Sequence, residues 1–93
     1  MLLKFVRAHV IISGEVQGVG FRFHTRIKAR NLDLKGFVRN LDSGEVEVVF
    51  EGEKDKVKEM IEWCKKGPDS ALVKDVKVKF ENYTGEFENF EAT

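Results

Sequence analysis

Apolar and polar residues alternate along four segments of the chain, and this period of two predicts β-strands with one apolar face. The four segments are residues 6–13, 35–41, 45–51 and 76–80. Between the second and the third, Asp42, Ser43 and Gly44 are typical turn residues and predict a hairpin. Phe87 and Phe90 indicate a short fifth strand near the carboxyl end.

Two other segments repeat their apolar residues at intervals of three and four, which predicts amphipathic helices. The first ends near residues 31–33, and its apolar face consists of Phe21, Thr25, Ala29 and Leu32. The second is stopped by Gly67 and Pro68, and its apolar face consists of Val57, Met60, Ile61 and Cys64. Cys64 is therefore expected to be a buried, inert thiol.

The order strand, helix, strand, strand, helix, strand predicts an α+β fold, the ferredoxin-like split βαβ sandwich. Its four- to five-stranded antiparallel sheet carries both helices on one face. In that topology the strand at residues 45–51 lies between the strands at 6–13 and 35–41 and runs opposite to both. The carboxyl ends of those two strands then share one edge, so Asn40 is expected about 10 Å from the segment that follows residue 13.

That segment, residues 13–22, is a glycine-rich loop that leads into the first helix. Gly14, Gly18 and Gly20 permit positive φ angles and let backbone N–H groups approach a ligand closely. The amino end of the helix adds free N–H donors and a partial positive charge. Arg22 offers two parallel N–H donors to two phosphate oxygens. The loop therefore predicts a phosphate site rather than a sugar or metal site.

Composition restricts the remaining possibilities. The 93 residues, 42% of them hydrophobic, predict a single domain over residues 1–93. Sixteen Lys and Arg against sixteen Asp and Glu give no net charge, which argues against a broad nucleic-acid-binding surface. One cysteine and no apolar leader predict a cytoplasmic protein without disulfides. A charged fraction of 34%, rich in Lys and Glu, favours a thermophilic source.

Two motifs contain the candidate chemistry. They are Gly14, x, Val16, Gln17, Gly18, Val19, Gly20, Phe21, Arg22 and Gly36, Phe37, Val38, Arg39, Asn40. Together they closely resemble the acylphosphatase family, and the resemblance continues through the hairpin, the second helix and residues 85–90. It implies hydrolysis of small acyl phosphates to a carboxylate and inorganic phosphate, without metal or cofactor.

The resemblance also implies roles for individual residues. Arg22 matches the arginine of the family that binds phosphate, and Asn40 matches the asparagine that positions the attacking water. The phosphoryl oxygens are expected on the backbone N–H groups of Glu15, Val16, Gln17, Gly18, Val19 and Gly20. No His, Cys, Asp or Glu is expected to take part in catalysis. The expected small molecules are the acyl phosphate substrate and inorganic phosphate, as product and competitive ligand. No nucleic acid or membrane partner is expected, and the protein is expected to be a monomer.

Some residues depart from the family pattern or have simpler interpretations. His24 stands where an aromatic ring is usual, Asp33 where glycine is frequent and Phe37 where tryptophan is frequent. Asp33 can adopt the left-handed conformation at a helix end. Phe23 and Ile27 point away from the core, and His9 is interpreted as an ordinary surface histidine on the outward side of its strand.

The alternative function is a non-catalytic ferredoxin-like module that binds nucleic acid or a small ligand. Lys35, Gly36 and Phe37 open like the strand motif of RNA-recognition domains. The aromatic positions of that motif are then missing, and the segment lies on the second strand instead of the third. Hydrolysis of an acyl phosphate without metal separates the enzyme from either binding module.

Overall fold

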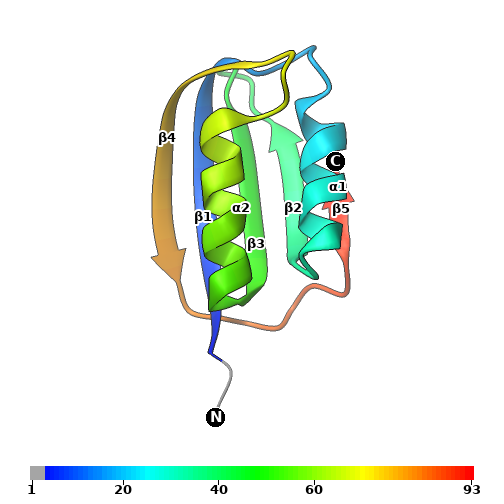
Figure 1. The fold of residues 1–93 in the computed structure, drawn as a ribbon, viewed down its shortest axis with the longest axis vertical. Coiled ribbons are helices and arrows are strands. Elements are labelled where there is room, and N and C mark those ends of the chain that lie inside the picture. Colours follow the sequence, from blue (N-terminus) through cyan, green and yellow to red (C-terminus); the bar gives the residue numbers. More distant parts are fainter. Residues whose placement is uncertain (1–3) are drawn as a thin grey trace.

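The computed structural model describes residues 4–93. Residues 1–3 belong to the predicted domain and to the amino end that was expected to carry no leader, and they lie outside the described residues. Figure 1 shows two helices packed on one face of a sheet. The elements are β1 (Phe5–Glu15), α1 (Phe21–Asn31), β2 (Lys35–Asn40), β3 (Val46–Glu53), α2 (Lys54–Lys66), β4 (Leu72–Glu81) and β5 (Phe90–Ala92). The predicted ferredoxin-like βαββαβ arrangement is confirmed.

The sheet has the strand order β4-β1-β3-β2-β5. β3 pairs antiparallel with both β1 and β2, as predicted, so the carboxyl ends of β1 and β2 meet at one edge. β5 differs, because it pairs parallel with β2 and makes the sheet mixed. The reason is visible in Figure 1, where the connection after β4 crosses one end of the sheet and β5 starts from that same end. β5 must then run opposite to β4 and parallel to β2.

The expected fifth strand was placed partly wrong, because β5 begins at Phe90 and leaves Phe87 outside it. Phe87 instead packs against Phe37, with the two ring centroids 6.0 Å apart. The first strand is longer than predicted and continues to Glu15 across a β-bulge between Ser13 and Gly14. Asp33 has a φ of 56°, the left-handed conformation expected for it at the end of the first helix.

The core lies between the sheet and the two helices, and the predicted apolar faces of the helices and of the first three strands form most of it. The strand predicted at 76–80 differs, because Val78 and Phe80 are exposed and only Val76 packs against the core. The fully buried members include Ala8, Val10, Ile12, Val46, Val48, Phe50, Val57, Met60 and Cys64. Thr25, the polar residue in the face of α1, is buried too and donates a hydrogen bond to the carbonyl of Phe21 at 2.7 Å. Burial raises the pKa of the Cys64 thiol to about 12, which agrees with an inert side chain.

The opposite face of the sheet carries several charged residues together with Val49 and Phe37, and the connection of residues 82–89 covers part of it. His9 lies on this face, as predicted, but it is not an ordinary surface residue, because its Nε2 atom lies 2.6 Å from Glu47 Oε2. Glu47 also accepts a hydrogen bond from Arg39. The two partners outweigh the effect of burial and lower the pKa of Glu47 below its usual value.

Candidate active site

Three connections gather at the end of the molecule where β1 and β2 finish (Figure 1): the loop of residues 16–20, the β2–β3 hairpin and the connection from α2 to β4. Gly18 and Gly20 in the loop have φ angles of 74° and 77°, which side chains rarely allow. Val16 is 1% exposed and anchors the loop in the core. Among residues 4–93, the N–H groups of residues 16–20 donate no hydrogen bond, so they are available to a ligand.

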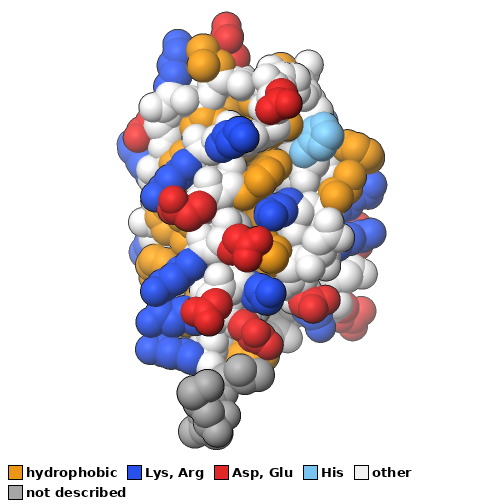
Figure 2. All heavy atoms as spheres, in the orientation of Figure 1, with side chains coloured by type: hydrophobic (Ala, Val, Ile, Leu, Met, Phe, Trp, Pro, Cys, Tyr) orange, Lys and Arg blue, Asp and Glu red, His pale blue; other side chains and the backbone are white. Residues whose placement is uncertain are grey.

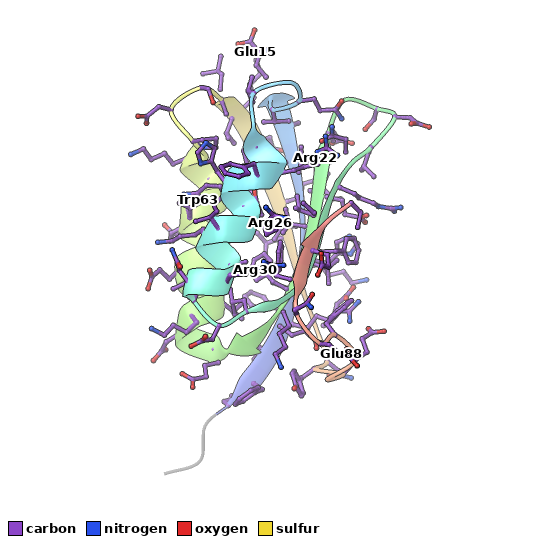
Figure 3. The ribbon with its side chains drawn as sticks, turned by 90° about the vertical axis from the view of Figure 1, so that its right-hand side faces the viewer. Glu15, Arg22, Arg26, Arg30, Trp63 and Glu88 are labelled. Atoms are coloured by element: carbon purple, nitrogen blue, oxygen red, sulfur yellow. The ribbon has the colours of Figure 1, made fainter. Side chains whose placement is uncertain are left out.

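Gly14 and Glu15 belong to β1 rather than to this loop. A Cβ atom on Gly14 would lie 2.2 Å from the carbonyl oxygen of Leu72, so the glycine is required where β1 bulges against β4. Glu15 pairs with Leu72, and its side chain points away from the fold at the tip of the molecule (Figure 3). The loop that turns toward α1 therefore begins at Val16, one residue later than the predicted set of backbone donors.

Two side chains fix the loop from either side. Gln17 Nε2 donates to the carbonyls of Leu41 and Glu45, at 2.8 and 2.9 Å, and ties the loop to the hairpin. Ser70 Oγ donates to the carbonyl of Val19 at 2.6 Å and ties it to the α2–β4 connection. The sequence singled out Gln17 only for its backbone N–H and did not single out Ser70. A serine in a connection carries no sequence signal for a contact 51 positions away.

The amino end of α1 has no internal cap. Gly20 occupies the N-cap position in a left-handed conformation, no side chain caps the helix, and the first turn contains no acidic residue. The first hydrogen bond into the helix runs from His24 N to Gly20 O at 3.1 Å. The N–H groups of the first turn and the positive end of the helix dipole are therefore left for an anion.

Arg22 lies in this first turn and is exposed. Its NH1 atom donates to the main-chain oxygen of Thr93 at 2.9 Å, so the C-terminal segment after β5 supports the guanidinium group. Within the described residues Arg22 forms no ion pair with an acidic side chain. A guanidinium has five N–H donors, so several remain for a ligand.

Asn40 is the last residue of β2, and its Oδ1 atom is buried without a hydrogen-bond partner in the part of the chain that the structure describes. Buried polar atoms nearly always have a partner, so this acceptor requires an explanation. Asn40 and Arg22 line one hollow, which has a volume of about 280 Å³. Its other lining residues are Val16, Gly20, Phe21, Phe23, Arg26 and Ala92. The structure thus brings Arg22, the end of the loop and Asn40 together, as the topology predicted.

A second hollow, larger at about 640 Å³, lies between α1 and α2 and includes His24 and Trp63. It contains neither Arg22 nor Asn40. His24 is exposed, and its ring lies 5.3 Å from that of Phe23 between centroids. The histidine therefore does not line the hollow of Arg22.

Charges on the helix-bearing face are mixed, since Figure 2 shows acidic and basic side chains interspersed over it. Among residues 4–93, no group of three or more His, Cys, Asp or Glu is arranged to hold a metal ion. None of the helices in that range is long and apolar enough to cross a lipid bilayer. The features that remain at the hollow are backbone N–H donors, the guanidinium groups of Arg22 and Arg26, and the amide of Asn40. Such a set can bind an anion and orient a water molecule beside it.

Comparisons with known proteins agree with this chemistry. The family model described as acylphosphatase matches residues 8–92. The acylphosphatase of Syntrophobacter fumaroxidans is 53% identical over 87 residues, which are 94% of this chain and 90% of the relative. The acylphosphatase of Chloroflexus aurantiacus is also 53% identical, over 83 residues, with coverage of 89% and 90%.

A solved structure gives the same result for the backbone. The acylphosphatase from Coxiella burnetii superimposes with a TM-score of 0.90 at 38% sequence identity. The match covers 96% of this chain and 93% of the other.

Proposed function

The chain belongs to the acylphosphatase family and hydrolyses acyl phosphates, and we propose that it does so in the hollow between the 16–20 loop, Arg22 and Asn40. The observation that carries this assignment is the Oδ1 atom of Asn40, a buried acceptor without a hydrogen-bond partner among residues 4–93, on a residue that lines the same hollow as Arg22. An acceptor in that position suits a water molecule held beside a bound phosphoryl group.

The phosphoryl group would occupy the end of the hollow at the start of α1. Its non-transferring oxygens would accept hydrogen bonds from the N–H groups of the loop and of the first helical turn. Arg22 would add a bidentate contact and offset the negative charge. Because the loop is fixed by Gln17 and Ser70, these donors are oriented before the substrate arrives.

The water would lie on the Asn40 side and donate one of its hydrogens to Oδ1. Its oxygen attacks phosphorus as the bond from phosphorus to the bridging oxygen breaks, and the acyl group leaves as a carboxylate. The proton of the water passes to a phosphate oxygen, so the products are a carboxylate and inorganic phosphate. A carboxylate is a weak base and leaves without being protonated, so no side chain is needed as a general acid or a general base.

The test is hydrolysis of benzoyl phosphate with a chelator present, measured for the wild type, Arg22→Ala and Asn40→Ala. Each substitution is expected to lower kcat/KM by about 100-fold or more, the usual effect of removing one preorganised contact to a transition state. Arg39→Ala and Asn82→Ala are matched controls, since Arg39 pairs with Glu47 on the other face of the sheet and Asn82 is exposed. Near-wild-type activity of both site variants would contradict the assignment of these residues.

The proposal also retains the finer predictions from the sequence. Inorganic phosphate is expected to compete with the substrate for the same donors. Catalysis is expected to proceed without metal or cofactor, in a monomeric cytoplasmic protein of one domain that binds no nucleic acid. The thermophilic source likewise stays a prediction. A binding module without catalysis is not favoured, because nearly the whole chain matches enzymes of one family.

A further inference from the structure

Three arginines follow one another along α1 at intervals of four residues, namely Arg22, Arg26 and Arg30. Residues at this interval lie on one face of a helix, and Figure 3 shows the three in a row next to β5. The outer two are held by the C-terminal segment. Arg22 donates to Thr93 O, and Arg30 donates to Phe90 O at 3.0 Å and lies 3.6 Å from Glu91.

Arg26, in the middle of the row, has no such partner. Within residues 4–93 it forms neither a hydrogen bond nor an ion pair with another residue. Its guanidinium carbon lies 6.0 Å from the centroid of the Phe23 ring, close enough for a cation–π contact. Arg26 is half-buried, and both side chains line the hollow that contains Arg22 and Asn40.

The hollow therefore contains two guanidinium groups and no acidic side chain. A bound phosphoryl group can satisfy Arg22 and the loop donors. Arg26 originates about 6 Å further along the helix, because four residues rise 1.5 Å each. A half-buried cation in a hollow that no carboxylate lines favours a second anionic group, and the acyl part of the substrate can supply one.

We propose that Arg26 determines specificity by binding a second anionic group on the acyl part of the substrate. The preferred substrates are then acyl phosphates that bear a distal carboxylate, and the 54% exposed ring of Phe23 lies along the carbon skeleton between the two charges. This inference depends on the proposed location of the active site. It adds a preference among substrates that the phosphate-binding groups (the loop N–H donors and Arg22) and Asn40 do not supply.

The experiment compares two substrates of the same shape, 3-carboxybenzoyl phosphate and 3-carbamoylbenzoyl phosphate. They differ in the charge of the meta substituent, which stands two ring carbons away from the carbon that carries the acyl phosphate. kcat/KM is measured for both with the wild type, Arg26→Met and Lys28→Met. Lys28→Met is the matched control, because it also removes one positive charge from α1, at a residue that pairs with Glu59 and lies outside the hollow.

The wild type is expected to prefer the carboxylate substrate by about tenfold, the effect of one charged hydrogen bond at a partly exposed site. Arg26→Met should abolish this preference and change kcat/KM for the carboxamide by less than about twofold. Lys28→Met should preserve it, and high salt should weaken it.

Three results would overturn the inference. One is an absence of preference in the wild type. Another is an equal loss for both substrates in Arg26→Met, which would mean that Arg26 serves the phosphoryl group itself. A third is the same loss of preference in Lys28→Met, which would indicate a general charge effect of the helix. Absence of hydrolysis with either substrate would instead overturn the proposed function, so the two failures are distinguishable.

Discussion

Two polar regions of this molecule are built in opposite ways, although each contains a buried side-chain oxygen. At the end where β1 and β2 finish, Asn40 Oδ1 has no partner among the described residues, and the N–H groups of the 16–20 loop donate to none of them. On the outer face of the sheet, the carboxylate of Glu51 is 2% exposed and both of its oxygens accept hydrogen bonds. The region around Asn40 keeps hydrogen-bonding groups without partners among the described residues, whereas the carboxylate of Glu51 is fully paired.

The partners of Glu51 come from two distant parts of the chain. Thr84 donates through its N and Oγ1 atoms, both at 2.8 Å, and Gly85 N donates at 3.0 Å. Arg7 NH1 lies 3.4 Å away and also contacts Glu86. Burial by itself would raise the pKa of Glu51, but these donors outweigh it, and the pKa lies below its usual value. The cluster fixes the connection between β4 and β5.

The difference between the two regions separates stability from function. A buried acceptor without a partner costs about 1–3 kcal/mol, whereas a paired one contributes to stability. The outer cluster therefore stabilises the fold, and the unpaired groups around Asn40 are retained at a cost that a bound ligand can offset. Substitutions in the two regions should consequently affect different measurements.

The largest effects, of similar size, are expected from Arg22→Lys and Asn40→Ala. An ammonium group cannot reproduce the two parallel N–H donors of the guanidinium, so kcat/KM should fall by about 100-fold and inorganic phosphate should inhibit far more weakly. The inhibition constant of phosphate in the benzoyl phosphate assay measures this directly. Unchanged inhibition would show that the bidentate contact is not made.

Asn40→Ala should separate the two properties within one variant. We expect kcat to fall by about 100-fold while the free energy of unfolding stays unchanged or rises by about 1 kcal/mol, because an unpaired buried acceptor has been removed. Urea unfolding of the same samples provides the second measurement. A loss of stability similar to that of a core substitution would mean that Asn40 has a structural role instead.

Glu51→Gln should show the reverse pattern. The neutral amide replaces charge-assisted hydrogen bonds and brings one donor opposite other donors, so the free energy of unfolding should fall by about 2–3 kcal/mol. kcat/KM of the folded variant should stay within about twofold of the wild type. Glu88→Gln is the control, since Glu88 is exposed on the same connection and should change neither quantity by a comparable amount.

The contribution of Glu51 should also depend on pH. Its pKa is lower in the folded protein than in the unfolded chain, so the stabilisation is complete above the unfolded pKa of about 4.3 and is lost as the pH falls through the folded value. The stability difference between the wild type and Glu51→Gln should therefore be constant near neutral pH and shrink in acid. A difference that grows in acid would contradict the direction of the shift.

The smallest effect is expected from Cys64→Ala, which belongs to neither polar region. Removal of one buried sulfur should lower the free energy of unfolding by about 1 kcal/mol at neutral pH and below, where the thiol is protonated in both the folded and the unfolded chain, with turnover unchanged. A selective loss of turnover in the folded variant would show that the thiol takes part in catalysis.

Most of the fold was predictable because the period of apolar residues changes clearly from two to 3.6 at Phe21 and again at α2. The direction of β5 was not, because its three residues, Phe90–Ala92, carry too little pattern to show which strand they join. The site was predictable in part, since the topology placed Asn40 opposite the glycine loop. The contacts that fix the site were not predictable. Ser70 donates to the main-chain oxygen of Val19, and Arg22 donates to that of Thr93, and a contact to a main-chain oxygen leaves no pattern in the sequence.

The sequence by itself determined the elements, their order and the two motifs, since each depends on local spacing along the chain. Only the tertiary structure decided which polar groups are satisfied. Whether Asn40 Oδ1 or Glu51 has a hydrogen-bond partner depends on residues far away in the chain. The same holds for two arginines one helical turn apart, since Arg22 donates to Thr93 whereas Arg26 has no such partner among the described residues. Pairing is a property of the assembled surface, and here it separates the groups that hold the fold from those available to a ligand.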